Sequence, residues 1–385
     1  MNAIAIENRR SRAAWRPERC GRIALVLQGG GALGAYQAGV YQALHESGLE
    51  PDWVSGVSIG AINAAIIAGN SPERRLERLR IFWERITEGA AWPNFPDGDV
   101  FRRAQNAMSS LMTAAIGRPG FFTPHLINPW LSLAGAKTAT SYYDNEPLRK
   151  TLSELVDFRL INQKTCRFSV GVVNVLSGNF LFFDNATTEI GPEHVMASGA
   201  LPPAFAPVKI GTDYYWDGGI VSNTPLQHLL AQDDNTNCLV FQVDLFSAHG
   251  ALPRTIQEVE GRHKDIMYSS RTRQVTDMFQ RLQRWKSRAH RALLKVPKAD
   301  LTDEEQAMLD KLADLPVHSI IQLIYQQQAH EGNGKDYEFS GISMREHWTI
   351  GHEDTVASLS HKDWLVIPPD NGGIVTYDVH RDRHR

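Results

Sequence analysis

The chain has 385 residues, of which 42% are hydrophobic and 22% charged, and its formal net charge is −3 at pH 7. This length predicts one large domain with an extension, or two domains, and the charge gives no sign of nucleic-acid binding. Cys20, Cys166 and Cys238 are too few and too scattered for a disulfide framework or a zinc site, which favours a reducing compartment. No apolar run approaches the ~18 residues of a membrane-spanning helix. We therefore expect a cytoplasmic protein, either soluble or in peripheral contact with a membrane.

Residues 1–21 form a basic leader that lacks the apolar segment of a secretory signal. We expect this leader to be disordered, and contact with an anionic membrane is the alternative.

From residue 22 to about 250, short apolar runs alternate with helical patterns. Residues 23–27 are an apolar run that ends in glycines, and residues 35–47 have helical character. Further strands are expected at 53–57, 167–175 and 238–245, with an alanine-rich helix at 59–68. This alternation predicts a mostly parallel sheet that helices cover on both faces.

Residues 90–143 interrupt this alternation with Pro, Gly and large apolar side chains, among them Trp92, Phe95, Phe121 and Trp130. Two interpretations are open for this insertion. It is either a helical flap on the core or a lid that supplies a wall for an acyl chain, because apolar ligands need aromatic-lined concavities.

Residues 29–34 fit the G-x-G-x-x-G spacing of a dinucleotide site, but the same glycines suit the oxyanion loop of an acyl-transfer enzyme. A dinucleotide site also needs an acidic side chain at the far end of the second strand. Glu50 and Asp52 precede that strand. The pattern therefore favours backbone N–H donors for an oxyanion, contributed by Gly29, Gly30 and Gly31.

The second strand ends in Gly-Val-Ser-Ile-Gly, a G-x-S-x-G motif between a strand and a helix. In this context Ser58 is a candidate nucleophile on a sharp turn. Gly56 and Gly60 would leave room for an incoming ester. The N-terminus of the following helix would place partial positive charge behind the serine.

A third glycine-flanked stretch, YYWDGGIVSNTP, offers a base for this serine. Asp217 is the candidate, followed by Gly218 and Gly219, although an ordinary Asp-Gly turn would look the same. Asn223, a few residues later, either positions the aspartate loop or serves only the turn.

These three stretches together resemble the patatin-like phospholipases, with the match covering about residues 22–245. The resemblance implies a three-layer α/β/α sandwich in which Ser58 attacks a lipid ester carbonyl and Asp217 acts as general base without a histidine. It also implies neither a metal nor a cofactor. The chain departs from the family at Leu33, where an Arg or Lys is common, so ester hydrolysis is a firmer expectation than phospholipid preference.

We place the catalytic domain at residues 22–250 and a largely helical extension at 251–385, similar to one in a bacterial branch of the family. Within it, residues 281–298 contain seven basic and no acidic side chains around an apolar stripe. This segment is either a peripheral membrane contact or a surface helix that packs on the catalytic domain. The sequence leaves the oligomeric state open.

Three alternatives compete with this assignment. A Ser-His-Asp triad would use His228 or His249. The fold could instead belong to a catalytically silent lipid-binding or scaffold protein, or, more distantly, to a dinucleotide-binding protein. Four further histidines, which lack a compact ligand set, are expected at the surface or in the core rather than on a metal: His347, His352, His380 and His384.

Overall fold

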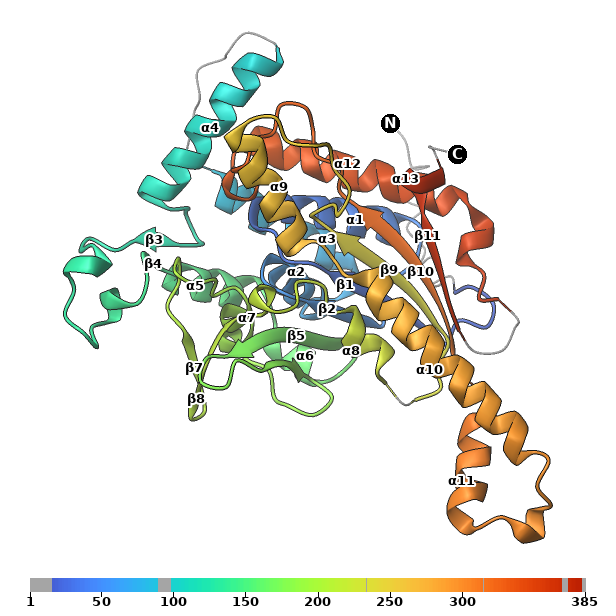
Figure 1. The fold of residues 1–385 in the computed structure, drawn as a ribbon. Helices are drawn as coiled ribbons and strands as arrows, with labels where there is room; N and C mark the ends of the chain where they lie inside the picture. The colour runs from blue at the N-terminus through green and yellow to red at the C-terminus, as the bar shows by residue number, and fades with distance from the viewer. Residues whose placement is uncertain (1–15, 89–97, 233, 314, 369–372, 383–385) are drawn as a thin grey trace, which may run out of the picture.

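The computed structural model describes residues 16–88, 98–232, 234–313, 315–368 and 373–382. A central sheet runs through the molecule and helices flank it (Figure 1). Most of the predicted leader lies outside the described residues, as do the first residues of the predicted insertion, including Trp92 and Phe95.

Six neighbouring strands of the sheet are parallel, in the order β11, β10, β9, β1, β2, β5. They are β1 Arg22–Leu27, β2 Trp53–Gly56, β5 Arg167–Asn174, β9 Cys238–Asp244, β10 Val317–Ile324 and β11 Gly373–Asp378. Three antiparallel strands complete the edge beyond β5: β6 Phe180–Asp184, β7 Val208–Ile210 and β8 Asp213–Asp217. Two short strands pair separately, β3 Thr123–Pro124 and β4 Tyr143–Asp144.

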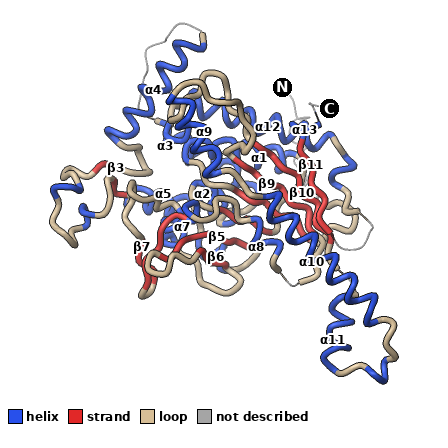
Figure 2. Tube along the Cα trace, in the orientation of Figure 1, coloured by secondary structure: helices blue, strands red, loops and turns tan. Residues whose placement is uncertain are grey.

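Helices cover both faces of the sheet (Figure 2). One face packs against α1 Ala35–Glu46, α2 Ile59–Ala68, α3 Pro72–Thr87 and α12 Gly341–Ser360. The other face packs against α8 Leu226–Leu230 and α10 Thr272–Leu293. The remaining helices are α4 Asp99–Ile116, α5 Glu146–Leu155, α6 Phe158–Asn162, α7 Pro192–Ser198, α9 Ile256–Tyr268, α11 Asp303–Leu312 and α13 Val379–Asp382. The predicted three-layer α/β/α architecture is confirmed.

Helix α2 explains why the centre of the fold is so apolar. All ten of its residues are buried, so it needs no polar face, and its Ala and Ile side chains fill the space between sheet and outer helices. The helix begins directly after Ser58. The end of β2 and the start of α2 are therefore both fixed by the core.

The C-terminal region is built into this fold. Its helical character is confirmed, but β10 and β11, which the sequence analysis did not predict, extend the sheet beside β9. Helix α12 crosses α1 at very short range: a Cβ on Gly39 would lie 1.9 Å from the Trp348 carbonyl oxygen, and one on Gly351 would lie 2.1 Å from that of Tyr36. The boundary at residue 250 stays a prediction.

Helix α10 covers only part of the basic segment predicted at 281–298, because it ends at Leu293. Its buried Phe279 packs on the sheet, whereas Leu282 and Trp285 are 47% and 67% exposed. These two apolar side chains are thus largely exposed although α10 packs on the sheet, and membrane contact by this segment stays a prediction. Across the described residues, no helix is both long enough and apolar enough to cross a bilayer.

Candidate active site

Ser58 stands on a strained turn between β2 and α2. Its φ of +56° lies in the region that non-glycine residues rarely adopt, which is where a nucleophile is held when its side chain must project. The Ser58 N–H donates to Ser198 Oγ at 2.9 Å, and that hydroxyl donates to the Gly171 carbonyl at 2.7 Å. Ser198, at the end of α7, is buried and thus ties the turn to β5.

The glycines that flank Ser58 serve the backbone. A Cβ on Gly56 would lie 2.3 Å from the Gly60 carbonyl oxygen, and one on Gly60 would lie 2.4 Å from the Leu27 carbonyl oxygen. Both positions therefore need glycine so that β2, α2 and the end of β1 can approach one another. The room that we assigned to an incoming ester is occupied by the chain itself.

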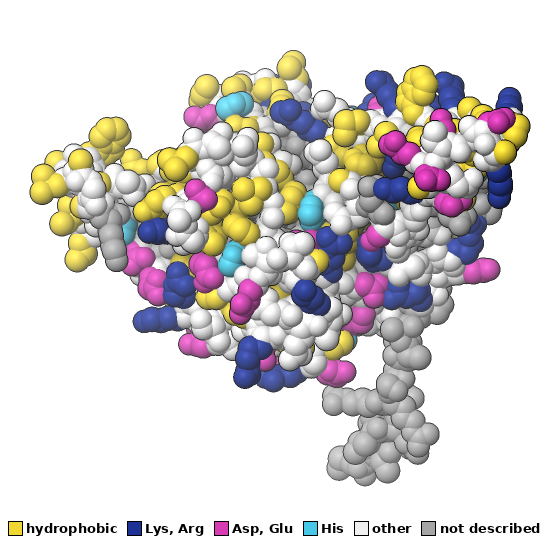
Figure 3. All heavy atoms as spheres, turned by 90° about the horizontal axis from the view of Figure 1, so that it is seen from below, with side chains coloured by type: hydrophobic (Ala, Val, Ile, Leu, Met, Phe, Trp, Pro, Cys, Tyr) yellow, Lys and Arg dark blue, Asp and Glu magenta, His cyan; other side chains and the backbone are white. Residues whose placement is uncertain are grey.

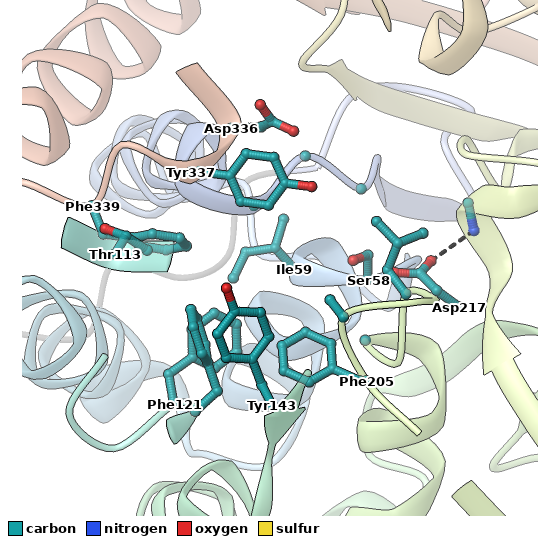
Figure 4. A pocket seen from close by; sticks show the side chains of 18 of the residues that line it. Ser58, Ile59, Thr113, Phe121, Tyr143, Phe205, Asp217, Asp336, Tyr337 and Phe339 are labelled. Carbon is teal, nitrogen blue, oxygen red and sulfur yellow. Dashed lines mark hydrogen bonds between the residues drawn. The ribbon is translucent and has the colours of Figure 1, made fainter. Parts of the chain in front are cut away.

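Asp217 ends β8 and points toward Ser58 (Figure 4). The Gly219 N–H donates to one carboxylate oxygen at 2.7 Å, and the Ser58 hydroxyl lies near enough to the carboxylate to lower its pKa. Burial raises the pKa of Asp217 to about 7, although the Ser58 hydroxyl and the Gly219 N–H both act to lower it. Near neutral pH this carboxylate is thus a stronger base than an exposed one.

The glycine loop after β1 lies beside this pair. The Gly29 N–H donates to the Asn223 carbonyl oxygen at 3.3 Å, while the amides of Gly30 and Gly31 have no acceptor among the residues that the structure describes. Gly31 has φ +56°, and a Cβ there would lie 2.2 Å from the Asp336 carbonyl oxygen. All three glycines line the same pocket as Ser58 and Asp217.

Two buried amides that the sequence analysis did not place here hold the loop. Gln28 donates to the Thr224 hydroxyl and to the Tyr268 carbonyl, both at 2.9 Å. Asn223 donates to the carbonyls of Gly29 and Tyr268, both at 3.0 Å. Asn223 therefore binds the glycine loop, which is neither of the roles considered for it. In the sequence, the only signal for Gln28 was an amide side chain directly before the glycine run.

A cavity of about 400 Å³ opens beside Ser58. None of the described residues that line it is Lys, Arg or His, and nine are aromatic: Phe121, Phe122, Phe205, Phe246, Phe339, Tyr142, Tyr143, Tyr268 and Tyr337. The insertion supplies one wall through Phe121, Phe122 and both tyrosines at 142 and 143, together with side chains of α4. Figure 4 shows aromatic rings from this wall and from the C-terminal region converging on the serine.

The C-terminal region forms the opposite wall, which we call the roof, residues 335–339. Lys264 of α9 pairs with Asp336 at 2.7 Å, and Lys335 pairs with Asp265 at 2.7 Å. These pairs fasten the roof to α9, so that Tyr337 and Phe339 lie over the pocket. No local motif in the sequence indicated these residues.

The structure does not bring the competing histidines to Ser58. His228 contacts Asp184 at 3.0 Å and stacks on Phe182, His249 is exposed, and neither lines the pocket. The other described histidines of interest each face one carboxylate: His347 with Glu331, His352 with Glu46 and His380 with Asp354. His384 lies outside the described residues. Within the described ranges, no three His, Cys, Asp or Glu side chains gather as a metal site.

The acidic residues considered for a dinucleotide site lie at the other end of the strands. Glu50 pairs with Arg75 at 2.6 Å, and Asp52 accepts from the Ile23 N–H, at the start of β1, at 2.8 Å. Neither lines the pocket beside the glycine loop. The dinucleotide interpretation therefore lacks its ribose-binding carboxylate.

Known proteins resemble this chain in several ways. Over 205 residues it is 25% identical to an uncharacterized NTE family protein of Mycobacterium bovis, which covers 53% of this chain and 44% of the relative. It is 54% identical over 50 residues to a lysophospholipase of Aspergillus terreus, covering 13% of this chain and 3% of the relative. It is 45% identical over 62 residues to a triacylglycerol lipase of Schizosaccharomyces pombe, covering 16% of this chain and 13% of the relative. The chain thus matches less than half the length of each relative.

Among solved structures, VipD from Legionella pneumophila aligns over 90% of this chain and 67% of its own, with 18% identity and a TM-score of 0.36. A family profile described as patatin-like phospholipase matches residues 25–230, and a second, described as patatin phospholipase, matches 266–371. The first profile spans more than half of the chain and contains Ser58 and Asp217. The chain belongs to the patatin-like phospholipase family.

Proposed function

We propose that this protein is a serine acyl hydrolase that cleaves the carboxylic esters of lipids through Ser58 and Asp217. The observation that carries the proposal is the position of the Ser58 hydroxyl beside the buried Asp217 carboxylate, in an apolar, aromatic-lined pocket. A nucleophile that lies beside its base, next to room for an acyl chain, is the arrangement that ester cleavage needs.

In the first step, Ser58 Oγ forms a bond to the ester carbonyl carbon while its proton passes to Asp217. The raised pKa of Asp217, about 7, matches this task because a carboxylate of ordinary pKa would be too weak a base. Collapse of the tetrahedral intermediate breaks the bond to the alcohol, which takes the proton from Asp217. The acyl group is then bound to Ser58.

In the second step, water attacks the acyl-enzyme and Asp217 accepts its proton. The new carbon–oxygen bond forms as the bond to Ser58 Oγ breaks, and the proton returns to the serine. The products are a free fatty acid and the restored Ser58–Asp217 pair.

The negative charge that develops on the carbonyl oxygen needs donors that are not already engaged. The Gly29 N–H is bonded to Asn223, so we assign the donors to Gly30 and Gly31 and give Gly29 the role of anchoring the loop. The N-terminus of α2, which starts at Ile59, adds partial positive charge on the same side of the site.

A fluorophosphonate probe tests this assignment, because it reacts only with an activated serine. We expect one label per chain on wild type, no label on Ser58→Ala and strongly slowed labelling on Asp217→Asn. Ser153→Ala, at an exposed serine of α5, is the matched control and should label like wild type. Undiminished labelling of a folded Ser58→Ala would refute the nucleophile. Absence of label on a wild type that still binds lipid would favour the silent lipid-binding protein.

A further inference from the structure

An apolar projection stands beside the pocket, and we call residues 125–136 the prong. It leaves the body between β3 and β4 and lies at the far left of Figure 1. Five large hydrophobic side chains on it are mostly exposed: Leu126 at 104%, Ile127 at 56%, Trp130 at 84%, Leu131 at 82% and Leu133 at 85%. Exposed apolar groups gathered in this way mark interaction sites.

The prong is held in shape by its own polar groups. Asn128 accepts from the Trp130 N–H at 3.1 Å, and the hydroxyls of Ser132 and Thr138 are 2.8 Å apart. The indole N–H of Trp130 donates to the Tyr142 hydroxyl at 3.1 Å. The hydrogen-bonding groups are thus satisfied inward while the apolar side chains face outward, so exposure here is not a consequence of an unfolded loop.

The apolar surface is continuous with the pocket. Tyr142, which accepts from Trp130, also lines the pocket, and so does Tyr143 in β4. Helix α4 contributes pocket-lining residues and exposes Met108, Leu111 and Met112 at 50%, 63% and 37%. Figure 3 shows hydrophobic side chains running from the projection at the left onto the body of the molecule.

The near absence of charged residues around the prong, together with its projecting shape, indicates what kind of partner it binds. From residue 123 to residue 143 the sequence contains no Asp or Glu, and its only basic side chains are His125 and Lys137. A projecting tip offers a protein partner little of the roughly 800 Å² per side that a stable interface buries. A fluid hydrocarbon phase, in contrast, can surround a convex apolar tip, and Trp is favoured where that phase meets water.

We propose that the prong inserts into the interfacial layer of a lipid bilayer and so places the pocket at the membrane surface. The proposal rests on the proposed function, because a lipid ester must pass from a bilayer into the pocket. The driving force is burial of apolar area rather than charge attraction. Docking should therefore persist at high salt and on zwitterionic lipid, unlike docking by the basic segment at 281–298.

Sedimentation with phosphatidylcholine vesicles at high salt tests the proposal. We expect the triple variant Leu126→Ser, Trp130→Ser, Leu133→Ser to lose at least about tenfold in vesicle partitioning, because each replaced side chain contributes apolar area. The matched control is Leu176→Ser with Leu252→Ser, at residues 79% and 86% exposed elsewhere, and it should partition like wild type. Trp285→Ser on α10 makes the same aromatic-to-polar change at the competing surface and should also be neutral.

Hydrolysis of a short-chain, water-soluble ester separates this proposal from the proposed function. None of the three replaced side chains lines the pocket, so the triple variant should turn over this ester like wild type. If wild type does not hydrolyse the ester, the proposed function fails, while vesicle partitioning still decides on the prong. Unchanged vesicle partitioning of the triple variant would overturn the proposal. If, in addition, the triple substitution converts a wild-type dimer to a monomer, the prong is a contact between two copies of this chain instead.

Discussion

The floor and the roof of the pocket are built in different ways. The floor consists of Ser58, Asp217 and the glycine loop, and hydrogen bonds of the buried side chains of Ser198, Gln28 and Asn223 hold it. The roof, residues 335–339, is fastened to α9 by two ion pairs: the pair between Lys335 and Asp265 is largely buried, and the pair between Lys264 and Asp336 is partly exposed. Buried bonds fix geometry, whereas partly exposed pairs are weaker and can open. We infer that the floor determines the chemistry and the roof determines access.

The floor is most sensitive at Asp217. Replacing Asp217 with Asn removes the proposed base but keeps the shape, so turnover of any ester should fall about 10²- to 10⁴-fold. The matched control is Asp213→Asn at the first residue of β8, which should retain wild-type turnover. A folded Asp217→Asn variant with near wild-type turnover would contradict the assigned base.

The same substitution should stabilise the protein at alkaline pH. Because burial raises the pKa of Asp217 from 3.8 to about 7, the folded state holds a proton that the unfolded state has lost in this interval. This side chain's contribution to stability therefore falls as pH rises from about 4 to about 7. The melting temperature of Asp217→Asn should exceed that of wild type above pH 7, and this gain should vanish near pH 4.

The pH dependence of wild-type activity probes the floor without a substitution. Since the proposed mechanism needs Asp217 in its ionised form, kcat/KM for a neutral ester should rise with pH and reach a plateau above about 7. Two pH units below that pKa, about one carboxylate in a hundred is ionised, so activity should be about a hundredfold lower. A limb with a midpoint near 4 would mean that Asp217 is hydrated during turnover and that its burial does not govern the reaction.

Gly31 is the point where floor and roof meet. Gly31→Ala would place a Cβ 2.2 Å from the Asp336 carbonyl oxygen at a backbone φ of +56°, so either the loop or the roof must shift. We expect at least about a tenfold fall in turnover, because displaced donors no longer face the oxyanion. Gly178→Ala is the control: its φ is +70° but nothing lies near, so it should lower stability by about 1–2 kcal/mol without affecting turnover.

The contrast between floor and roof also explains what the sequence could predict. Short motifs after β1, after β2 and at the end of β8 pointed to the glycine loop, Ser58 and Asp217, because tight turns restrict residue type locally. The helix expected at 59–68 has the bounds observed for α2. Which loop amides are free depends on Asn223, almost 200 residues away, and no local pattern carries that information.

The roof was missed for the same reason. Its residues reach the pocket through the packing of α9 and α12 and through β10, not through a motif. Strand β10 itself carries a local signal, the β-branched apolar run VHSIIQLI. Ser198 likewise acts through a single long-range hydrogen bond, which spacing in the sequence does not reveal.

Because the described pocket lining holds no basic side chain, we expect the enzyme to prefer uncharged substrates over anionic ones. Leu33 is fully buried where the family often has a basic residue, and the described lining contains no Lys, Arg or His. An anionic headgroup near the ester would find no compensating charge. We expect several-fold higher kcat/KM for an uncharged glyceride than for an anionic phospholipid with the same acyl chains, both dispersed in neutral detergent. Equal values would show that the headgroup stays in water, outside the pocket.

Substitutions at the roof should have the smallest effect on activity, and only with long-chain substrates. Lys264→Met removes the pair with Asp336, which fastens the roof to α9, and the hydrogen bond to the Asn333 carbonyl just before the roof. Because exposed and partly exposed pairs contribute roughly 0.2–1 kcal/mol, we expect KM for long-chain esters to change about two- to fivefold. The turnover number for a short ester should stay unchanged, since Ser58 and Asp217 do not contact this pair. Lys209→Met, an exposed lysine of β7, is the control. A large loss on the short ester would mean that the roof also positions the floor, and the division between chemistry and access would fail.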